Sequence, residues 1–163
     1  MRNKKVQFIV HAAAIAAIYV VLTVLFAPIG FGDVQLRFAE ALTILPVFTP
    51  AAIPGLFIGC LIGNMLGGAI LLDIVFGSLA TLAGAVGTYF FRKQKYLAPV
   101  FPIAANTIVV PLVLYYGYGI TVPIAIQMLT VGLGEVLSCG VLGLILMTAL
   151  NKYRGVIFKN HTV

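Results

Sequence analysis

The stretch "PGLFIGCLIGNMLGGAI", residues 54–70, decides the class of fold. It contains no charged residue, and glycine recurs at every fourth position, at Gly55, Gly59, Gly63 and Gly67. A helix with this spacing presents a stripe without side chains, where the backbone of another helix can approach closely. The stripe therefore predicts tight packing of membrane helices, and we expect the partner helix to belong to the same chain.

Similar apolar runs fill the rest of the sequence. The chain has 163 residues, of which 62% are hydrophobic and 9% are charged. Soluble domains are about 45–50% apolar and about 25% charged, so a chain of this size has too little polar surface to be soluble. The composition predicts an all-α polytopic membrane protein that forms a single integral membrane domain over residues 1–163.

The apolar runs predict six transmembrane helices. Their approximate limits are 8–26, 38–49, 54–72, 74–91, 97–116 and 122–150. A full crossing takes about 20 apolar residues, so the second run is too short and is expected to start at or below the headgroups. The sixth run is long enough to cross with tilt.

The basic residues predict the orientation. Nine of the ten Lys and Arg residues lie in "MRNKK", "FRKQKY" and "NKYRGVIFK", at the ends of apolar runs. The positive-inside rule then places both termini and the loop after the fourth helix in the cytoplasm. The tenth is Arg37. Although the net charge is +6, no extended basic face exists to follow a phosphate backbone, which argues against a nucleic-acid partner.

A carboxylate inside an apolar helix is the strongest functional signal. Glu135 lies well inside the sixth predicted helix, where translocon scales give a cost of about 2.5–3.5 kcal/mol at the helix centre. It must face the protein interior or a watery pocket, and we favour a ligand contact over a buried structural hydrogen bond. Asp73, between the third and fourth runs, either caps the fourth helix or contacts the same ligand.

Three amides add to this set. Asn64 lies beside the glycine stripe, Asn106 lies in the fifth run, and Gln127 lies two turns from Glu135 towards the outer end. Each has two readings: the asparagines either join helices or bind ligand, and Gln127 is either solvated or binds ligand.

The polar stretch "FGDVQLRFAEAL", residues 31–42, gathers Asp33, Gln35, Arg37 and Glu40 around Phe38. If the stretch is helical, both acidic residues lie within one turn of Arg37 and pair with it. It is then either a solvated salt-bridge cluster or a lid that directs Glu40 into an outward-facing pocket. We favour the lid.

Catalysis and metal binding have little support in the sequence. No helix carries a histidine pair, no phosphate-binding loop is present, and no nucleophile is paired with a base. Cys60 and Cys139 are single cysteines within apolar runs and are interpreted as packing residues. We therefore expect no cofactor and no enzyme. An intramembrane enzyme with Glu135 and Asp73 as acid and base is the alternative from another class.

Two stretches resemble a known family. These are "HAAAIAAIY", residues 11–19, and "VQLRFAEALTILPVFTPAAIPGLFIGCLIGN", residues 34–64. Together with six helices in so short a chain, they resemble the substrate-binding S-components of energy-coupling factor (ECF) transporters. The second stretch is similar to the QueT family, whose members are described as transporters of queuosine precursors.

The resemblance implies a function and partners. It implies capture of a 7-deazaguanine, such as 7-aminomethyl-7-deazaguanine or queuine, at the outer face of a prokaryotic cell membrane. The loop between the first two helices would close the pocket. The protein would dock on a transmembrane coupling subunit served by two ATPase subunits and would tilt as a whole. The docking face implied by the resemblance consists of Ala12, Ala13, Ala16 and Ala17.

The side chains suit such a ligand. A 7-deazaguanine offers a ring N–H and an amine on one edge, and one carboxylate can accept from both. The candidate ligand contacts are Glu135, Glu40, Asp73, Arg37, Gln127, Asn106, Gln35 and Phe38. Two other transport functions stay open: an S-component for another small vitamin such as thiamin, and a proton-coupled carrier that uses Glu135.

Overall fold

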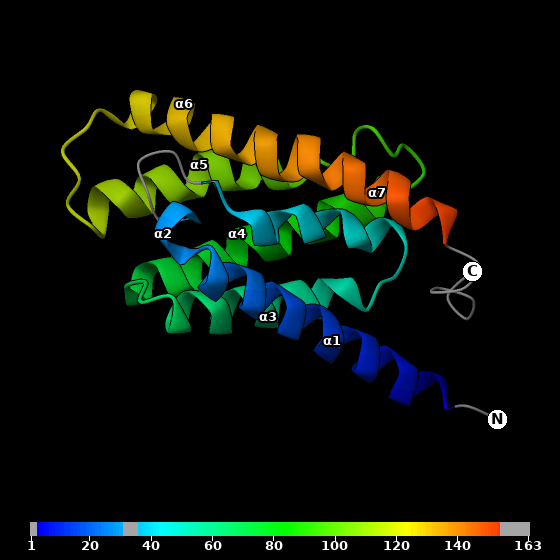
Figure 1. Ribbon diagram of the computed structural model, residues 1–163. Helices are drawn as coiled ribbons and strands as arrows, with labels where there is room; N and C mark the ends of the chain where they lie inside the picture. Colours follow the sequence, from blue (N-terminus) through cyan, green and yellow to red (C-terminus); the bar gives the residue numbers. More distant parts are fainter. Residues whose placement is uncertain (1–2, 31–35, 154–163) are drawn as a thin grey trace.

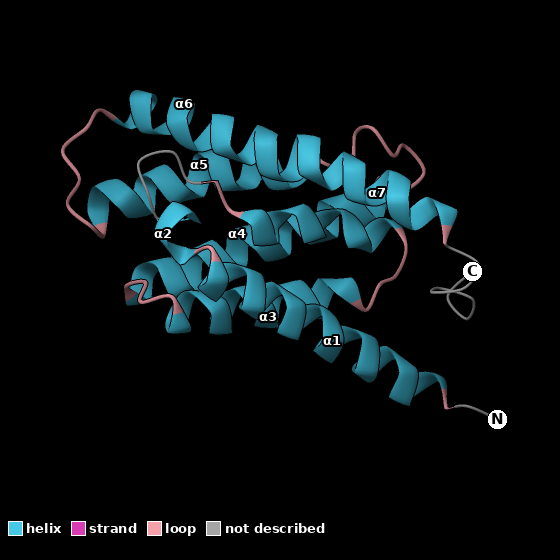
Figure 2. Cartoon of the chain, viewed as in Figure 1, coloured by secondary structure: helices cyan, strands magenta, loops and turns pink. Residues whose placement is uncertain are grey.

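The computed structural model describes residues 3–30 and 36–153, and within these ranges the chain is helical throughout, with no strand (Figures 1 and 2). The elements are α1 (Lys4–Leu25), α2 (Ala27–Gly30), η1 (Phe38–Val47), α3 (Ala52–Leu66), α4 (Leu71–Phe90), α5 (Val100–Tyr116), α6 (Ile124–Glu135), η2 (Val136–Leu142) and α7 (Gly143–Lys152). Helices α6, η2 and α7 follow one another without a break as a single span of 29 residues.

The helices have the length and composition of membrane spans. Three of those described are long and apolar enough to cross a bilayer: Lys4–Leu25, Leu71–Phe90 and Ile124–Lys152. Shorter apolar helices cover Phe38–Val47, Ala52–Leu66 and Val100–Tyr116. Large apolar side chains are exposed on the outside of the bundle, as expected of a surface that faces lipid. The prediction of an all-α polytopic membrane protein is confirmed.

The two ends of the bundle differ in charge. In Figure 1, α1 begins and α7 ends at the same end, where the η1–α3 and α4–α5 connections also lie. We call this the terminal end, and Lys95 Nζ donates there to Asn151 Oδ1 at 3.5 Å. At the opposite end, which we call the Asp73 end, Tyr118 Oη donates to Asp73 Oδ2 at 3.2 Å.

The second predicted helix is a 3-10 helix in the centre of the bundle. Element η1 contacts α1, α3, α4, η2 and α7, and most of its residues are buried. A 3-10 helix rises about 2.0 Å per residue, against about 1.5 Å in an α-helix. Ten residues therefore span about 20 Å, which is how so short a run reaches deep into the bundle.

The glycine stripe packs α3 against α1. A Cβ on Gly55 would lie 2.7 Å from the carbonyl oxygen of Ala12, and one on Gly59 would lie 2.8 Å from Tyr19 Cβ. Both separations are too short for real atoms, so the two helices approach as closely as they do only because these positions lack side chains. The expected packing within the chain is confirmed.

This seam divides the alanine face of α1. Ala16 is buried against Gly59, and the backbone of Ala12 lies beside Gly55. Ala13 and Ala17 are exposed on the outside of the bundle. In this arrangement Ala16 is therefore covered by α3, and the half-buried Ala12 is only partly available to a partner subunit.

We expect Gly59→Ala to destabilise the protein, because its new methyl group would collide with Tyr19. Overpacking of this kind costs about 1–3 kcal/mol. The midpoint of thermal unfolding can be followed with a thiol-reactive dye, since Cys60 and Cys139 are both buried and react when the bundle opens. Gly140→Ala is the matched control, because its Cβ would meet its nearest neighbours at 3.8 and 3.9 Å. Equal midpoints for the two variants would contradict the α1–α3 seam described here.

Candidate functional site

Polar side chains gather inside the bundle, towards the Asp73 end. The buried ones with charge or amide groups are Arg37, Glu40, Asn64, Asp73, Asn106, Gln127 and Glu135. Glu40 is 0% exposed and Glu135 is 1% exposed, so neither carboxylate is solvated. For Arg37 and Glu40 this rules out the reading as a solvated surface cluster.

Glu40 is held from three sides. Tyr19 Oη on α1 donates to Glu40 Oε1, and Thr81 Oγ1 on α4 donates to the same oxygen at 3.2 Å. Thr43 Oγ1 donates to the Glu40 carbonyl oxygen at 2.6 Å. The other carboxylate oxygen, Oε2, has no hydrogen-bond partner in the described part of the chain. One half of the carboxylate is thus fixed, and the other half is left available.

Glu135 approaches Glu40 from the opposite side of the interior. Cys139 Sγ donates to Glu135 Oε2 at 3.2 Å and also lies 3.4 Å from the carbonyl oxygen of Glu40. One ligand atom each from Glu40, Glu135 and Cys139 lie within 4.8 Å of one another, which is close enough to share one cation. Cys139 therefore does more than fill space, in contrast to its interpretation as a packing residue.

A change of helix type begins directly after Glu135. The π-helical element η2 carries the buried Ser138 and Cys139, which face the interior together with Glu135. Short π-helical turns within α-helices occur frequently at functional sites, because they redirect side chains locally. The surrounding glycines, Gly132 and Gly134, add no side chain that would crowd this turn.

Arg37, Asn64 and Asp73 form a second cluster, nearer the Asp73 end. Its Nη2 donates to Asn64 Oδ1 at 2.6 Å, and Asn64 Nδ2 donates to the carbonyl oxygen of Asp73 at 3.3 Å. Arg37 also interacts electrostatically with Asp73 and Glu40. The guanidinium thus links the two clusters, and Asn64 acts here as a connection between helices.

Asp73 does not cap α4. The capping position is Ile70, and Asp73 lies within the first turn, where its Oδ2 accepts from Tyr118. The backbone N–H of Ile70 donates to the same Tyr118 oxygen at 3.3 Å. Partial burial raises the pKa of the Tyr118 phenol, so the hydroxyl stays protonated and continues to donate. Tyr118 therefore fastens the α5–α6 connection to the start of α4.

The two amides of α5 and α6 behave differently. Gln127 is buried rather than solvated, and its Nε2 donates to the carbonyl oxygens of Val122 at 2.6 Å and Ile120 at 3.3 Å, which anchors the α5–α6 connection. Asn106 is fully buried near Glu135, and neither of its side-chain polar atoms has a hydrogen-bond partner among the described residues. Gln127 Oε1 is likewise buried without a partner in the described part of the chain, but of the two amides it is Asn106 that lies beside Glu135.

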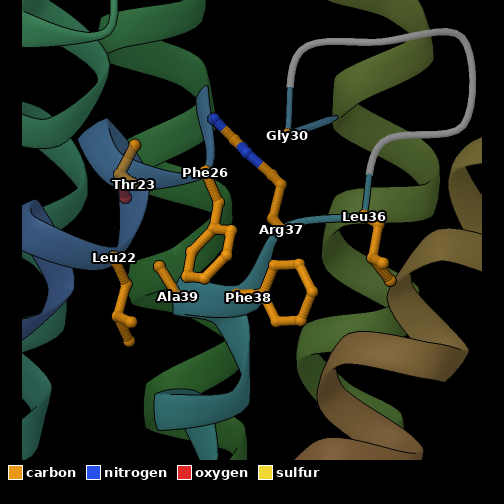
Figure 3. A pocket seen from close by; sticks show the side chains of 8 residues that line it. All are labelled: Leu22, Thr23, Phe26, Gly30, Leu36, Arg37, Phe38 and Ala39. Carbon is orange, nitrogen blue, oxygen red and sulfur yellow. The ribbon is translucent and has the colours of Figure 1, made fainter. Parts of the chain in front are cut away.

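A small cavity marks the start of η1. Its lining consists of Leu22, Thr23, Phe26, Gly30, Leu36, Arg37, Phe38 and Ala39 (Figure 3). The volume is about 10 Å³, enough for about one water molecule. The rings of Phe26 and Phe38 pack with their centroids 4.4 Å apart, while the Arg37 side chain extends past Phe26 and away from Phe38. This conformation is therefore closed at that point.

The structure brings some predicted residues together and not others. Glu40, Glu135 and Asn106 form one group, Arg37 and Asp73 form another, and Phe38 belongs to the aromatic pair at the cavity. Gln35 lies outside the described residues, as do Phe31 and Asp33. Tyr19 and Thr81 also belong to the site but were not predicted, because a lone Tyr or Thr in an apolar helix gives no distinct signal.

Comparison with known proteins now identifies the family. A family described as "QueT transporter" matches residues 9–152. The chain belongs to the QueT transporter family. This confirms the resemblance to the QueT family that the sequence showed.

One curated relative supports this assignment. The "Queuosine precursor transporter QueT" of Lactococcus lactis subsp. cremoris (strain MG1363) is 34% identical over 98 residues, which is 58% of this chain and 57% of the relative. The match thus spans little more than half the length of that relative. No solved structure matched the chain.

We expect Asn64→Ala to lower the free energy of unfolding by about 2–3 kcal/mol, because it removes a buried hydrogen bond to a charged group. Asn151→Ala is the matched control, since it removes only an exposed hydrogen bond to Lys95. Its effect should stay within about 0.5 kcal/mol. Thermal unfolding with the thiol-reactive dye measures both. A loss of stability in the control equal to that in Asn64→Ala would mean that the Arg37 contact contributes nothing specific.

Proposed function

We propose that this chain is the substrate-binding S-component of an ECF transporter and that it captures a queuosine precursor of the 7-deazaguanine class. Membership of the QueT transporter family and the similarity to a queuosine precursor transporter support the substrate class. The observation that carries the proposal is the pair of buried carboxylates, Glu40 and Glu135, together with the unused polar atoms of Asn106. A bundle this apolar has no structural need for such a group.

The chemistry of the ligand fits these side chains. The guanine-like edge carries adjacent N–H donors, which a carboxylate accepts in a two-point contact, and a carbonyl oxygen that needs a donor. Buried carboxylates and the guanidinium of Arg37 supply both kinds of group. The flat ring also needs apolar or aromatic walls, for which Phe26 and Phe38 stand at the start of η1.

The orientation follows from charge. The described Lys and Arg residues at the terminal end are Lys4, Lys5, Arg92, Lys93, Lys95 and Lys152. By the positive-inside rule this end faces the cytoplasm, and the Asp73 end then faces outwards. Ligand would enter at that end, past the α5–α6 connection and the start of η1.

Docking on the coupling subunit is assigned to the exposed half of the alanine face, Ala13 and Ala17. Small side chains allow a partner helix to approach closely in the membrane. Energy would come from the two separate ATPase subunits, which agrees with the lack of a phosphate-binding loop in this sequence.

We expect the purified protein to bind 7-aminomethyl-7-deazaguanine and to ignore thiamin. Glu135→Gln should weaken binding at least about tenfold, since it replaces a charge-assisted contact by a neutral one. Asn151→Ala should bind normally. Isothermal titration calorimetry on protein in nanodiscs measures all of these. Tight binding of thiamin without binding of the deazaguanine would show that the ligand is another vitamin.

We expect Ala17→Leu to abolish uptake and to leave ligand binding intact, because a bulky side chain keeps the partner helix away. Ala83→Leu is the control, since Ala83 is exposed on a different helix, α4. Uptake of labelled precursor in cells and binding to purified protein are the two measurements. If Ala17→Leu loses binding as well, Ala17 packs within the chain. Gradient-driven uptake in cells without ECF ATPases would favour the proton-coupled carrier instead.

A further inference from the structure

We propose that the Glu40–Glu135 pair is a site for one positive charge, held by a proton before the ligand binds and by the protonated amine of the ligand afterwards. This inference rests on the proposed function, because it specifies which 7-deazaguanine the site takes: one that carries an ammonium group, not a neutral substituent.

The geometry of the pair is the first support. The two carboxylates come from different elements, η1 and α6, and their ligand atoms lie within 4.8 Å of each other and of Cys139. Both are almost fully buried. Two carboxylates that share a buried site cannot both be ionised without a cation between them, and the simplest such cation is a shared proton.

The charge of the surroundings is the second support. The polar or titratable groups that surround the pair are Tyr19 on α1, Arg37 before η1, Cys60 and Asn64 on α3, Asp73 and Thr81 on α4, Asn106 on α5, and Ser138 and Cys139 on η2. Among these, Arg37 is the one cation in the described interior. Arg37 also interacts electrostatically with Asp73, so one guanidinium is shared by three carboxylates, those of Glu40, Asp73 and Glu135. The described interior therefore holds fewer positive charges than carboxylates.

The unused hydrogen-bonding atoms are the third support. Tyr19 and Thr81 occupy Glu40 Oε1, which leaves Oε2 with no partner. Asn106 Oδ1 and Ser138 Oγ are also buried and have no partner among the residues described. An ammonium group carries three N–H donors and no acceptor, so it can use Oε2, an oxygen of Glu135 and one of these two.

Binding then exchanges one cation for another. The carboxylic acid O–H of the pair ionises, its proton leaves to bulk water, and the ammonium of the ligand takes the same place with its own protons. The charge of the site does not change. A ligand with a nitrile at the same position brings no charge and no donor, so the proton stays and the carboxyl groups gain no hydrogen bond. The guanine-like edge is left to the Arg37 cluster, one turn of η1 nearer the Asp73 end.

The test compares two ligands on the full-length protein in nanodiscs. Calorimetry at one pH, in buffers that differ in ionisation enthalpy, counts the protons released. We expect 7-aminomethyl-7-deazaguanine to release about one proton and to bind at least about tenfold more tightly than 7-cyano-7-deazaguanine, which should release none. Because the complex holds one proton fewer at the pair, the affinity for the amine should rise by up to about tenfold per pH unit while the free pair is protonated.

Three variants test whether the released proton comes from the Glu40–Glu135 pair. Glu135→Gln should abolish the proton release and most of the preference for the amine, and Glu40→Gln is a second variant in case the first unfolds. Asp73→Asn makes the equivalent acid-to-amide change outside the pair and should keep the proton release, whatever its affinity. Equal binding of amine and nitrile without proton exchange overturns this inference and leaves the proposed function standing. Failure of both ligands to bind overturns the proposed function itself.

Discussion

The buried carboxylate of Glu40 is the constraint on which the rest of the structure depends. A charge in an apolar interior is tolerated only when it is hydrogen-bonded, and here the donors come from other helices: Tyr19 on α1 and Thr81 on α4. Tyr19 reaches Glu40 because α1 lies close against α3, which in turn requires Gly59 to have no side chain. The glycine stripe and the polar site are therefore linked through Tyr19, which packs on Gly59 and donates to Glu40.

Much of the fold is readable from the sequence because its signals are local. Apolar run length gives the six helical segments, and clustered Lys and Arg residues agree with the end at which α1 begins and α7 ends. The 3-10 form of η1 cannot be read from its own residues. Five other elements contact η1, so its sequence lacks the alternation of lipid-facing and buried positions that marks an outer helix. The sequence also could not separate the alanines of α1 that are available to a partner from those that are not. Only the position of α3 decides that Ala16 is buried and Ala17 is exposed.

The residues of the site likewise divide into those that the sequence reveals and those that only the structure reveals. Glu135, Glu40 and Asn106 are found from sequence because ionisable and amide groups within apolar runs are costly unless they are used. Tyr19, Thr81 and Cys139 are not, because each is common in membrane helices and gains its role only from what lies opposite. Arg37 was identified, but its partner Asn64 is 27 positions away and on another helix, a relation that the spacing alone does not contain.

The distribution of polarity also bears on the route that a ligand would take in the proposed function. Polar side chains extend from the carboxylate pair towards the Asp73 end, whereas the terminal side of η1 is closed by an apolar cluster of Ile44, Val47, Phe48, Ala98 and Met147. If a polar ligand binds at Glu40 and Glu135, as proposed, it has polar partners along the first route and meets a packed apolar wall along the second. Three members of that wall, Ile44, Val47 and Phe48, belong to η1 or follow it directly, so opening the wall would involve the backbone of η1 as well as side chains. In the proposed transport cycle, release at the terminal end would require the helices, or the whole protein, to move relative to the membrane, and the proposed ATPase subunits would drive that movement.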